Sequence, residues 1–183
     1  MTALELLLKR CSNPNLTEPA PSGLVLENIL SAAMAVPDHG GLSPFAIKVV
    51  RAEGLQGLTD AFVQATKSTT DDAFKIEKAA KMAFRAPMII VVSTQYQQHP
   101  KVPQHEQLIT AGCALQAMQM ACVAQGYQAM WRTGDIATHP IVKEALGVTE
   151  HNEIAGFLYV GSSSRDIHEK KRKGFEAIVS YWE

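Results

Sequence analysis

Three short stretches of the chain combine positive charge with hydroxyl groups or flexible backbone. They are Arg10-Cys11-Ser12, Trp131-Arg132-Thr133-Gly134 and Lys171-Arg172-Lys173. Arginine and hydroxyl donors form charge-assisted hydrogen bonds with phosphate oxygens, so each stretch could bind a phosphate. By residue type alone, Arg10 could equally be a favourable charge at a helix C-terminus, and the third stretch a solvated basic run. No GxGxxG or GxxxxGK[ST] motif occurs, so the two usual nucleotide-binding loops are absent.

The remaining reactive side chains form no recognisable catalytic or metal motif. The six histidines show no HxxxH or HExxH spacing, which argues against a metal site. They are His39, His99, His105, His139, His151 and His168. There is no GxSxG sequence. Cys11 and His39 could act as a thiol nucleophile and its base, and this alternative stays open.

The element that must position these groups runs from Glu106 to Gly134, with no charged residue between Glu106 and Arg132. Its Ala, Leu, Met and Gln residues favour a helix, and apolar residues on all sides predict a buried one. Gly126 would end the helix, and 127–131 reads as a short strand. Arg132 then lies where a buried element meets the surface. A membrane span is disfavoured by the interspersed glutamines and by the lack of a flanking basic cluster.

Small residues recur on this helix at helical spacing, which would let another backbone approach closely. They are Ala114, Ala117, Ala121 and Ala124. The C-terminal segment has an apolar part, 175–182, after its basic part. A single chain offers no evident cover for either feature. Both indicate a homodimer with exchanged arms.

The rest of the chain alternates helical and strand patterns. Helices are predicted at 4–10, 22–36, 55–65, 71–84 and 139–147, and strands at 45–52, 88–93 and 154–160. The turn-rich loop 37–44 could be functional or a plain connector. This order predicts a single α+β domain over residues 1–183, with helices flanking a small mixed sheet.

Composition narrows the class of protein. The net charge is −1 and the basic residues are scattered apart from one C-terminal cluster, so nothing suggests nucleic-acid binding. The three cysteines form no disulfide framework, and the first ten residues do not resemble a signal peptide. We expect a cytoplasmic protein that binds neither nucleic acid nor membrane.

Taken together, these stretches resemble the nitroreductase family of flavoproteins, and within it the short YdjA-like subgroup. The resemblance is carried by MTALELLLKRCS, EPAPSGLVLENILSAAMAVPDH, RAPMIIVVS, KVPQHEQLITAGCALQAMQMACVAQGYQAMWRTG and EIAGFLYVGS. It covers nearly the whole chain except about the last twenty residues. The resemblance implies the nitroreductase-like α+β fold and an intertwined homodimer with two FMN sites, each built from both subunits.

The resemblance also implies a set of site residues. Arg10, Cys11 and Ser12 would approach the FMN phosphate and ribityl chain, and Trp131, Arg132 and Thr133 would line the phosphate side. His39 would contact the flavin from the other subunit, and Ala35 would lie near it. A nicotinamide nucleotide would lie along Ala121, Cys122, Val123, Ala124, Gln125 and Gly126.

The implied activity is that of an FMN-dependent NAD(P)H oxidoreductase, with NADH or NADPH as reductant. Hydride would pass through flavin N5 to an electron-poor acceptor, such as a nitroaromatic, quinone or enone, with ping-pong kinetics. No side chain need act as acid or base, so no catalytic residue is assigned. Family members usually read Arg-Arg-Ser where this chain has Cys11, and Asn-x-Gln-Pro-Trp where it has Gly41 to Phe45. These departures favour an alternative, a flavin-binding dimer with little turnover that acts as a carrier or regulator.

Overall fold

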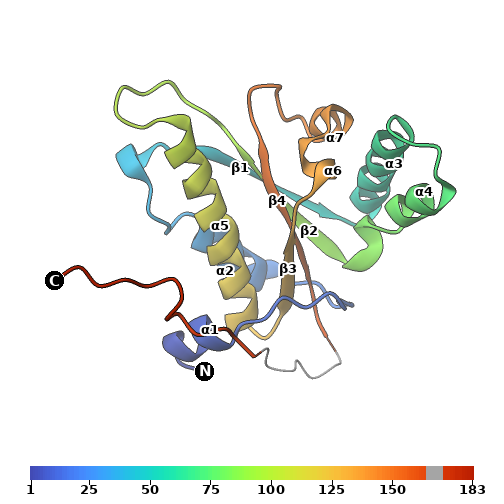
Figure 1. Ribbon diagram of the computed structural model, residues 1–183. Helices are drawn as coiled ribbons and strands as arrows, with labels where there is room; N and C mark the ends of the chain where they lie inside the picture. The colour runs from blue at the N-terminus through green and yellow to red at the C-terminus, as the bar shows by residue number, and fades with distance from the viewer. Residues whose placement is uncertain (164–170) are drawn as a thin grey trace.

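The computed structural model describes residues 1–163 and 171–183 of the chain. His168, one of the six histidines, and Lys170, which precedes the basic stretch 171–173, lie outside the described residues. Figure 1 shows a central sheet with helices on both faces and a C-terminal tail that runs away from the body of the chain.

The sheet contains four strands in the order β1-β2-β4-β3. Their bounds are Phe45–Arg51 for β1, Met88–Thr94 for β2, Gln128–Arg132 for β3 and Ile154–Gly161 for β4. All three neighbouring pairs are antiparallel. The α+β prediction is confirmed, but the prediction of a mixed sheet is wrong. Strands β2 and β3 do run in the same direction, yet β4 lies between them, so no two parallel strands become neighbours.

The helices follow the predicted order with altered ends. They are α1 Ala3–Lys9, α2 Gly23–Ala33, α3 Glu53–Lys67, α4 Ala73–Ala80, α5 Gln104–Ala124, α6 Asp135–Thr138 and α7 Pro140–Ala145, with short 3-10 turns η1 His39–Gly41 and η2 Ala83–Arg85. The fourth predicted helix is shorter than expected. It is capped by Asp72, whose carboxylate accepts from the Phe74 amide at 2.9 Å, and it ends before η2. Helix α6 was not predicted, because a single turn carries no periodic signal.

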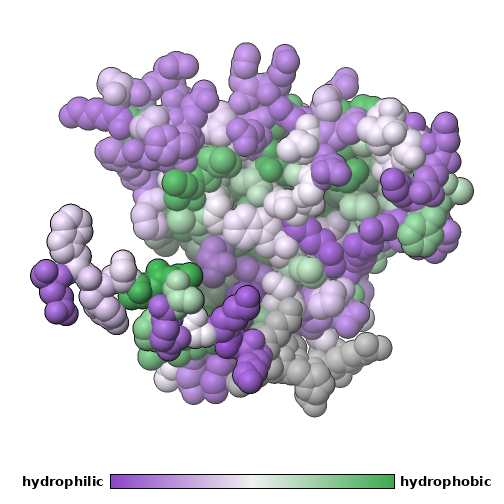
Figure 2. All heavy atoms as spheres, viewed as in Figure 1, coloured by the Kyte–Doolittle hydropathy of each residue, from purple (hydrophilic) through white to green (hydrophobic). Residues whose placement is uncertain are grey.

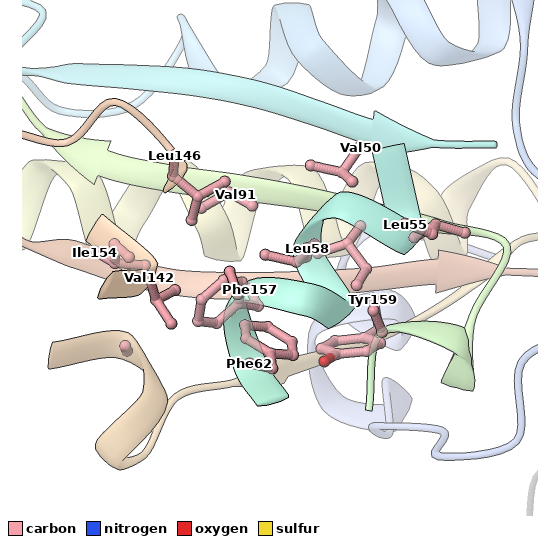
Figure 3. Packing of buried hydrophobic residues seen from close by; sticks show 14 of the residues in the cluster. Val50, Leu55, Leu58, Phe62, Val91, Val142, Leu146, Ile154, Phe157 and Tyr159 are labelled. Atoms are coloured by element: carbon pink, nitrogen blue, oxygen red, sulfur yellow. The ribbon is translucent and has the colours of Figure 1, made fainter. Parts of the chain in front are cut away.

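The alternation of side chains along the strands divides the core into two layers. On β2, Met88, Ile90 and Val92 pack against α2 and α5. Ile89 and Val91 point to the other face, toward α3, α6 and α7. Figure 3 shows this second layer, in which Phe62 and Phe157 meet edge to face with ring centroids 5.5 Å apart. The site residues can therefore be sorted by the face on which they lie.

Helix α5 buries only one face, where the sequence predicted burial on all sides. Gln107, Ala111, Ala114, Leu115 and Met118 lie on the buried face. The opposite face stays open in a single chain, where Ile109 is 62% exposed. By length and composition α5 could cross a membrane, a test that the core helix of a globular protein also passes, and α5 packs on the sheet.

Apolar side chains are also exposed on α1 and on the tail. Figure 2 shows hydrophobic spheres where the tail passes beside α1. The α1 residues are Leu4, Leu7 and Leu8, and the tail residues are Phe175, Ile178, Val179, Tyr181 and Trp182. These surfaces lie at the same end of the molecule as the end of α5 (Figure 1).

Trp131 packs so closely over Gly156 that no side chain fits there. A Cβ at Gly156 would overlap the Trp131 indole, which also lies over Gly112 of α5. We expect Gly156→Ala to lower the free energy of unfolding by about 1–3 kcal/mol, because the rigid indole must move. Gly57→Ala is the matched control. Gly57 lies in α3 with open space around it, so alanine should stabilise the protein by about 0.5–1 kcal/mol. Denaturant unfolding measures both, and equal effects would contradict the packing argument.

Candidate functional site

The segment after α1 brings the first cationic stretch onto the edge strand of the sheet. The Asn13 amide donates to the Ala129 carbonyl of β3 at 3.2 Å. Just before it, Arg10 is half-buried and its Nη1 donates to the Ser12 hydroxyl at 3.4 Å. The guanidinium and the hydroxyl of the first stretch therefore lie together.

The C-terminal tail supplies a second guanidinium at the same place. Arg172 donates from Nε to the Leu8 carbonyl at 2.9 Å and from Nη2 to the Arg10 carbonyl at 2.6 Å. Among residues 1–163 and 171–183, no ion pair joins Arg10 or Arg172 to a carboxylate. Arg172 therefore lies against the Arg10 backbone, while the Arg10 guanidinium lies beside the Ser12 hydroxyl. Guanidinium and hydroxyl donors of this kind fit a phosphate group. We call Arg10, Ser12 and Arg172 the N-terminal cradle.

Cys11 does not take part in the cradle through its side chain. Its thiol is buried, with 6% of the residue exposed, and it donates to the Lys9 carbonyl at 3.4 Å. A buried thiol is poorly placed to attack a substrate. The position where family members carry a second arginine thus holds a packing residue here.

The second stretch, at the end of β3, is divided between the two faces of the sheet. Trp131 lies on the α5 face and its indole N–H donates to the Ala155 carbonyl at 3.3 Å. Arg132 points to the opposite face, where its guanidinium carbon lies 5.4 Å from the Tyr159 ring centroid. Thr133 follows the strand and is exposed. Of the two side chains at the end of the strand, Trp131 therefore lies on the α5 face and Arg132 on the other.

The guanidinium of Arg132 lies in an electrostatically unfavourable place. Its Nε is buried and has no hydrogen-bond partner within the described part of the chain. Burial lowers the pKa of Arg132, and the nearby charge of Arg85 lowers it further. Burial likewise raises the pKa of Tyr159, against the opposing effect of the two arginines. The contact with the Tyr159 ring is a cation–π interaction that partly compensates for these costs.

His39 lies at the other end of α5, in the turn η1. Its Nδ1 is 2.7 Å from the Glu106 Oε2, in the first turn of α5. Ala35 is exposed just after α2, and its amide donates to the Ala32 carbonyl at 3.3 Å. In the sequence, Glu106 stands out only as the boundary of the charge-free run. A partner 67 residues away in the chain leaves no local pattern from which to infer the pair.

The two ends of α5 keep His39 away from the N-terminal cradle within one chain. His39 pairs with Glu106, whereas Gln119 donates to Ala129, the residue that also binds the segment after Arg10. Residues 106 and 119 are separated by about 20 Å along the helix, since each residue adds about 1.5 Å. The structure therefore does not bring Cys11 and His39 together. Within a single chain, the imidazole is not placed to act as a base for the thiol.

Residues 121–126 form the end of α5 and its C-terminal cap. Gly126 adopts a φ of +85°, and the Tyr127 amide donates to the Cys122 carbonyl at 2.9 Å. Gln125 accepts from Asn28 of α2 at 3.1 Å, so this side chain holds two helices together. Burial raises the pKa of the Cys122 thiol to about 12 and keeps it neutral. Ala124 and Gly126 are exposed.

The fold defines a class of α+β protein in which a long core helix packs on a small antiparallel sheet. The chain belongs to the nitroreductase family, whose family model matches residues 9–162. It is 44% identical over 162 residues to YdjA of Escherichia coli strain K12, which carries the provisional name NAD(P)H nitroreductase, with 88% of each chain covered. A Haemophilus influenzae protein with the same provisional name is 38% identical over 173 residues, 94% of each chain.

Solved structures agree with this fold. The nitroreductase-like family protein from Bacillus cereus has a TM-score of 0.89 at 21% identity, over 100% of this chain and 97% of that one. The FMN- and NADPH-dependent nitroreductase NfnB from sphigopyxis sp. strain HMH has a TM-score of 0.76 at 18% identity, over 100% of this chain and 99% of that one. The predicted family and the nitroreductase-like fold are confirmed.

Gln107 joins α5 to the loop that precedes it, and its loss should be costly. This fully buried side chain donates to the carbonyls of Gln97 and Val102 at 2.8 and 3.0 Å and accepts from the Gln97 amide at 2.9 Å. We expect Gln107→Ala to lower the free energy of unfolding by about 2–3 kcal/mol, because polar backbone groups lose their partners. Gln116→Ala, on the exposed face of the same helix, should stay within about 0.5 kcal/mol of wild type. Thermal or denaturant unfolding distinguishes the two, and a neutral Gln107→Ala would contradict this role.

Proposed function

We propose that this chain is an FMN-dependent NAD(P)H oxidoreductase of the nitroreductase type, and that it works in the cytoplasm as a homodimer. The observation that carries the proposal is the N-terminal cradle, in which the Arg10 guanidinium lies beside the Ser12 hydroxyl and the Arg172 guanidinium binds the Arg10 backbone. Family membership supports it, and so does the name of the FMN- and NADPH-dependent relative of similar fold. All three cysteines are free, which supports a reducing compartment.

The residues of this chain would divide the work of holding FMN. Arg10, Arg172 and Ser12 would bind the phosphate through charge-assisted hydrogen bonds. Cys11 would contribute backbone only, since its thiol points inward. In this proposal Arg172 supplies the cation that Cys11 lacks. The 131–133 stretch would add the Trp131 face and exposed backbone, while Arg132 holds the end of β3 against Tyr159.

The proposal shares each site between two chains. His39 lies at the start of α5, away from the cradle, which lies toward the other end of this helix. A flavin held by one cradle would therefore meet His39 and Ala35 of the partner copy. The open face of α5 and the exposed apolar tail support this arrangement, because both need a cover. The nicotinamide nucleotide would lie along 121–126, where Ala124 and Gly126 are exposed.

The chemistry that bound FMN supplies is hydride transfer, from NADH or NADPH to an electron-poor small molecule such as a nitroaromatic, quinone or enone, in ping-pong order. The protein's part is to bind and orient the cofactor and to exclude water. No acid or base is needed from a side chain. The proposal therefore assigns no catalytic residue.

A second candidate is a flavin-binding dimer with little turnover. It is favoured by the loop 41–45, which lacks the two amide side chains usual in the family. Gly41 adopts a φ of +64°, a left-handed conformation that asparagine also tolerates, so the backbone shape is kept while the amide is lost. The two candidates differ in whether NAD(P)H reduces the bound flavin.

Replacing Arg10 tests the cofactor site. We expect Arg10→Ala to weaken FMN binding by about ten- to a hundredfold, because one charged hydrogen bond to the phosphate is lost. Quenching of flavin fluorescence on titration measures the dissociation constant. Arg51→Ala makes the same charge change at the opposite edge of the sheet and should leave FMN affinity within twofold. Equal affinities for Arg10→Ala and wild type would refute the site assignment.

Replacing tail residues tests the dimer. We expect the double variant Ile178→Ser/Trp182→Ser to raise the dimer dissociation constant at least about tenfold, since buried aromatic anchors dominate interfaces. Sedimentation velocity over a range of concentrations measures it. Phe74→Ser is the control, because Phe74 is 74% exposed on α4 and lies away from the tail. A wild-type chain that stays monomeric at all concentrations would rule out the shared site.

A further inference from the structure

A carboxylate from α5 holds the histidine that the proposed function places at the flavin. Glu106 Oε2 lies 2.7 Å from His39 Nδ1. Neither residue is deeply buried, with side-chain exposures of 58% for His39 and 39% for Glu106. Exposed pairs of this kind contribute little to the free energy of folding, so stabilisation of the fold does not explain this contact.

The turn that carries His39 depends on two glycines for its backbone shape. Gly40 and Gly41 both adopt left-handed conformations, with φ of +80° and +64°. A Cβ on Gly40 would lie 3.5 Å from Val102, so the turn rests directly on the loop that leads into α5. Asp38 closes the turn from its own side, since its Oδ2 accepts from the Ser43 amide at 2.6 Å.

The first turns of α5 bind this region through three side chains in succession. Glu106 binds His39, Gln107 binds the loop at Gln97 and Val102, and the Thr110 hydroxyl donates to the Pro37 carbonyl at 3.4 Å. Gln107 and Thr110 are buried and fix the loops. Glu106 is the one of the three that contacts a side chain with a candidate site role.

We propose that Glu106 is a positioning residue that orients His39 and fixes its tautomer. A carboxylate accepts hydrogen bonds only, so the neutral imidazole must carry its proton on Nδ1 to donate to Glu106. Nε2 is then a bare acceptor, and it has no partner within residues 1–163 and 171–183. It is ready to accept from an N–H group such as the one that the isoalloxazine ring carries. This inference rests on the proposed function for its ligand but not for its geometry.

The tautomer can be measured without any cofactor. Long-range ¹H–¹⁵N spectra of the apo protein at alkaline pH, assigned with His39→Gln, should show His39 protonated on Nδ1. We expect Glu106→Ala to shift the ring toward the Nε2-protonated form, which is favoured in a free histidine side chain. Glu106→Gln keeps an acceptor oxygen and should largely restore the wild-type pattern. The tautomer is the discriminating readout, because loss of packing alone would not favour one ring nitrogen over the other.

FMN titration supplies the second readout. We expect Glu106→Ala to weaken FMN binding by about three- to tenfold and Glu106→Gln by less than twofold. Glu77→Ala removes a comparable exposed carboxylate, paired with Lys81 on α4, and should change neither spectrum nor affinity. An unchanged tautomer and unchanged affinity in Glu106→Ala would overturn the inference while leaving the proposed function intact. Failure of wild-type protein to bind FMN would overturn the proposed function and the flavin role of the pair with it.

Discussion

Helix α5 packs one face on the sheet through Ala111, Ala114 and Leu115, and this burial fixes the places of the candidate site residues. At the start of the helix, Glu106 holds the turn of His39. Near its end, Gln119 and the segment after Arg10 bind the same carbonyl of β3. A rigid helix of this length keeps the two groups apart within one chain.

The two cationic stretches near β3 differ in what surrounds their guanidinium groups. Arg172 binds the Arg10 backbone carbonyl, although the two residues are 162 positions apart in the chain. The Arg10 guanidinium and the Ser12 hydroxyl lie beside this contact and offer donors to an anion. At the end of β3, by contrast, Arg132 is held by the Tyr159 ring on the other face of the sheet. The two cationic stretches, which look alike in sequence, thus have different surroundings.

The sequence predicted well what depends on local pattern. The apolar runs of β2 and β4 and the uncharged helix α5 appear where composition placed them. The antiparallel sheet could not be predicted in this way. The last strand, β4, pairs between β2 and β3, and local sequence pattern does not specify which strands become neighbours. The contact of Arg172 with Leu8 joins residues 164 positions apart, and the His39–Glu106 pair spans 67. The side-chain direction of Arg132 required knowing the register of β3. The family resemblance named the site residues, and only the three-dimensional structure shows which of them lie together.

The most direct test of the account is the visible absorption spectrum of the purified protein, with added FMN and then with NADH or NADPH under anaerobic conditions. The account predicts a bound flavin band that NAD(P)H bleaches, and the more effective nucleotide identifies the preferred donor. A bound flavin that neither nucleotide reduces would contradict the oxidoreductase function and favour the carrier. A protein that is colourless after FMN has been added and the unbound FMN removed would contradict the cofactor site itself.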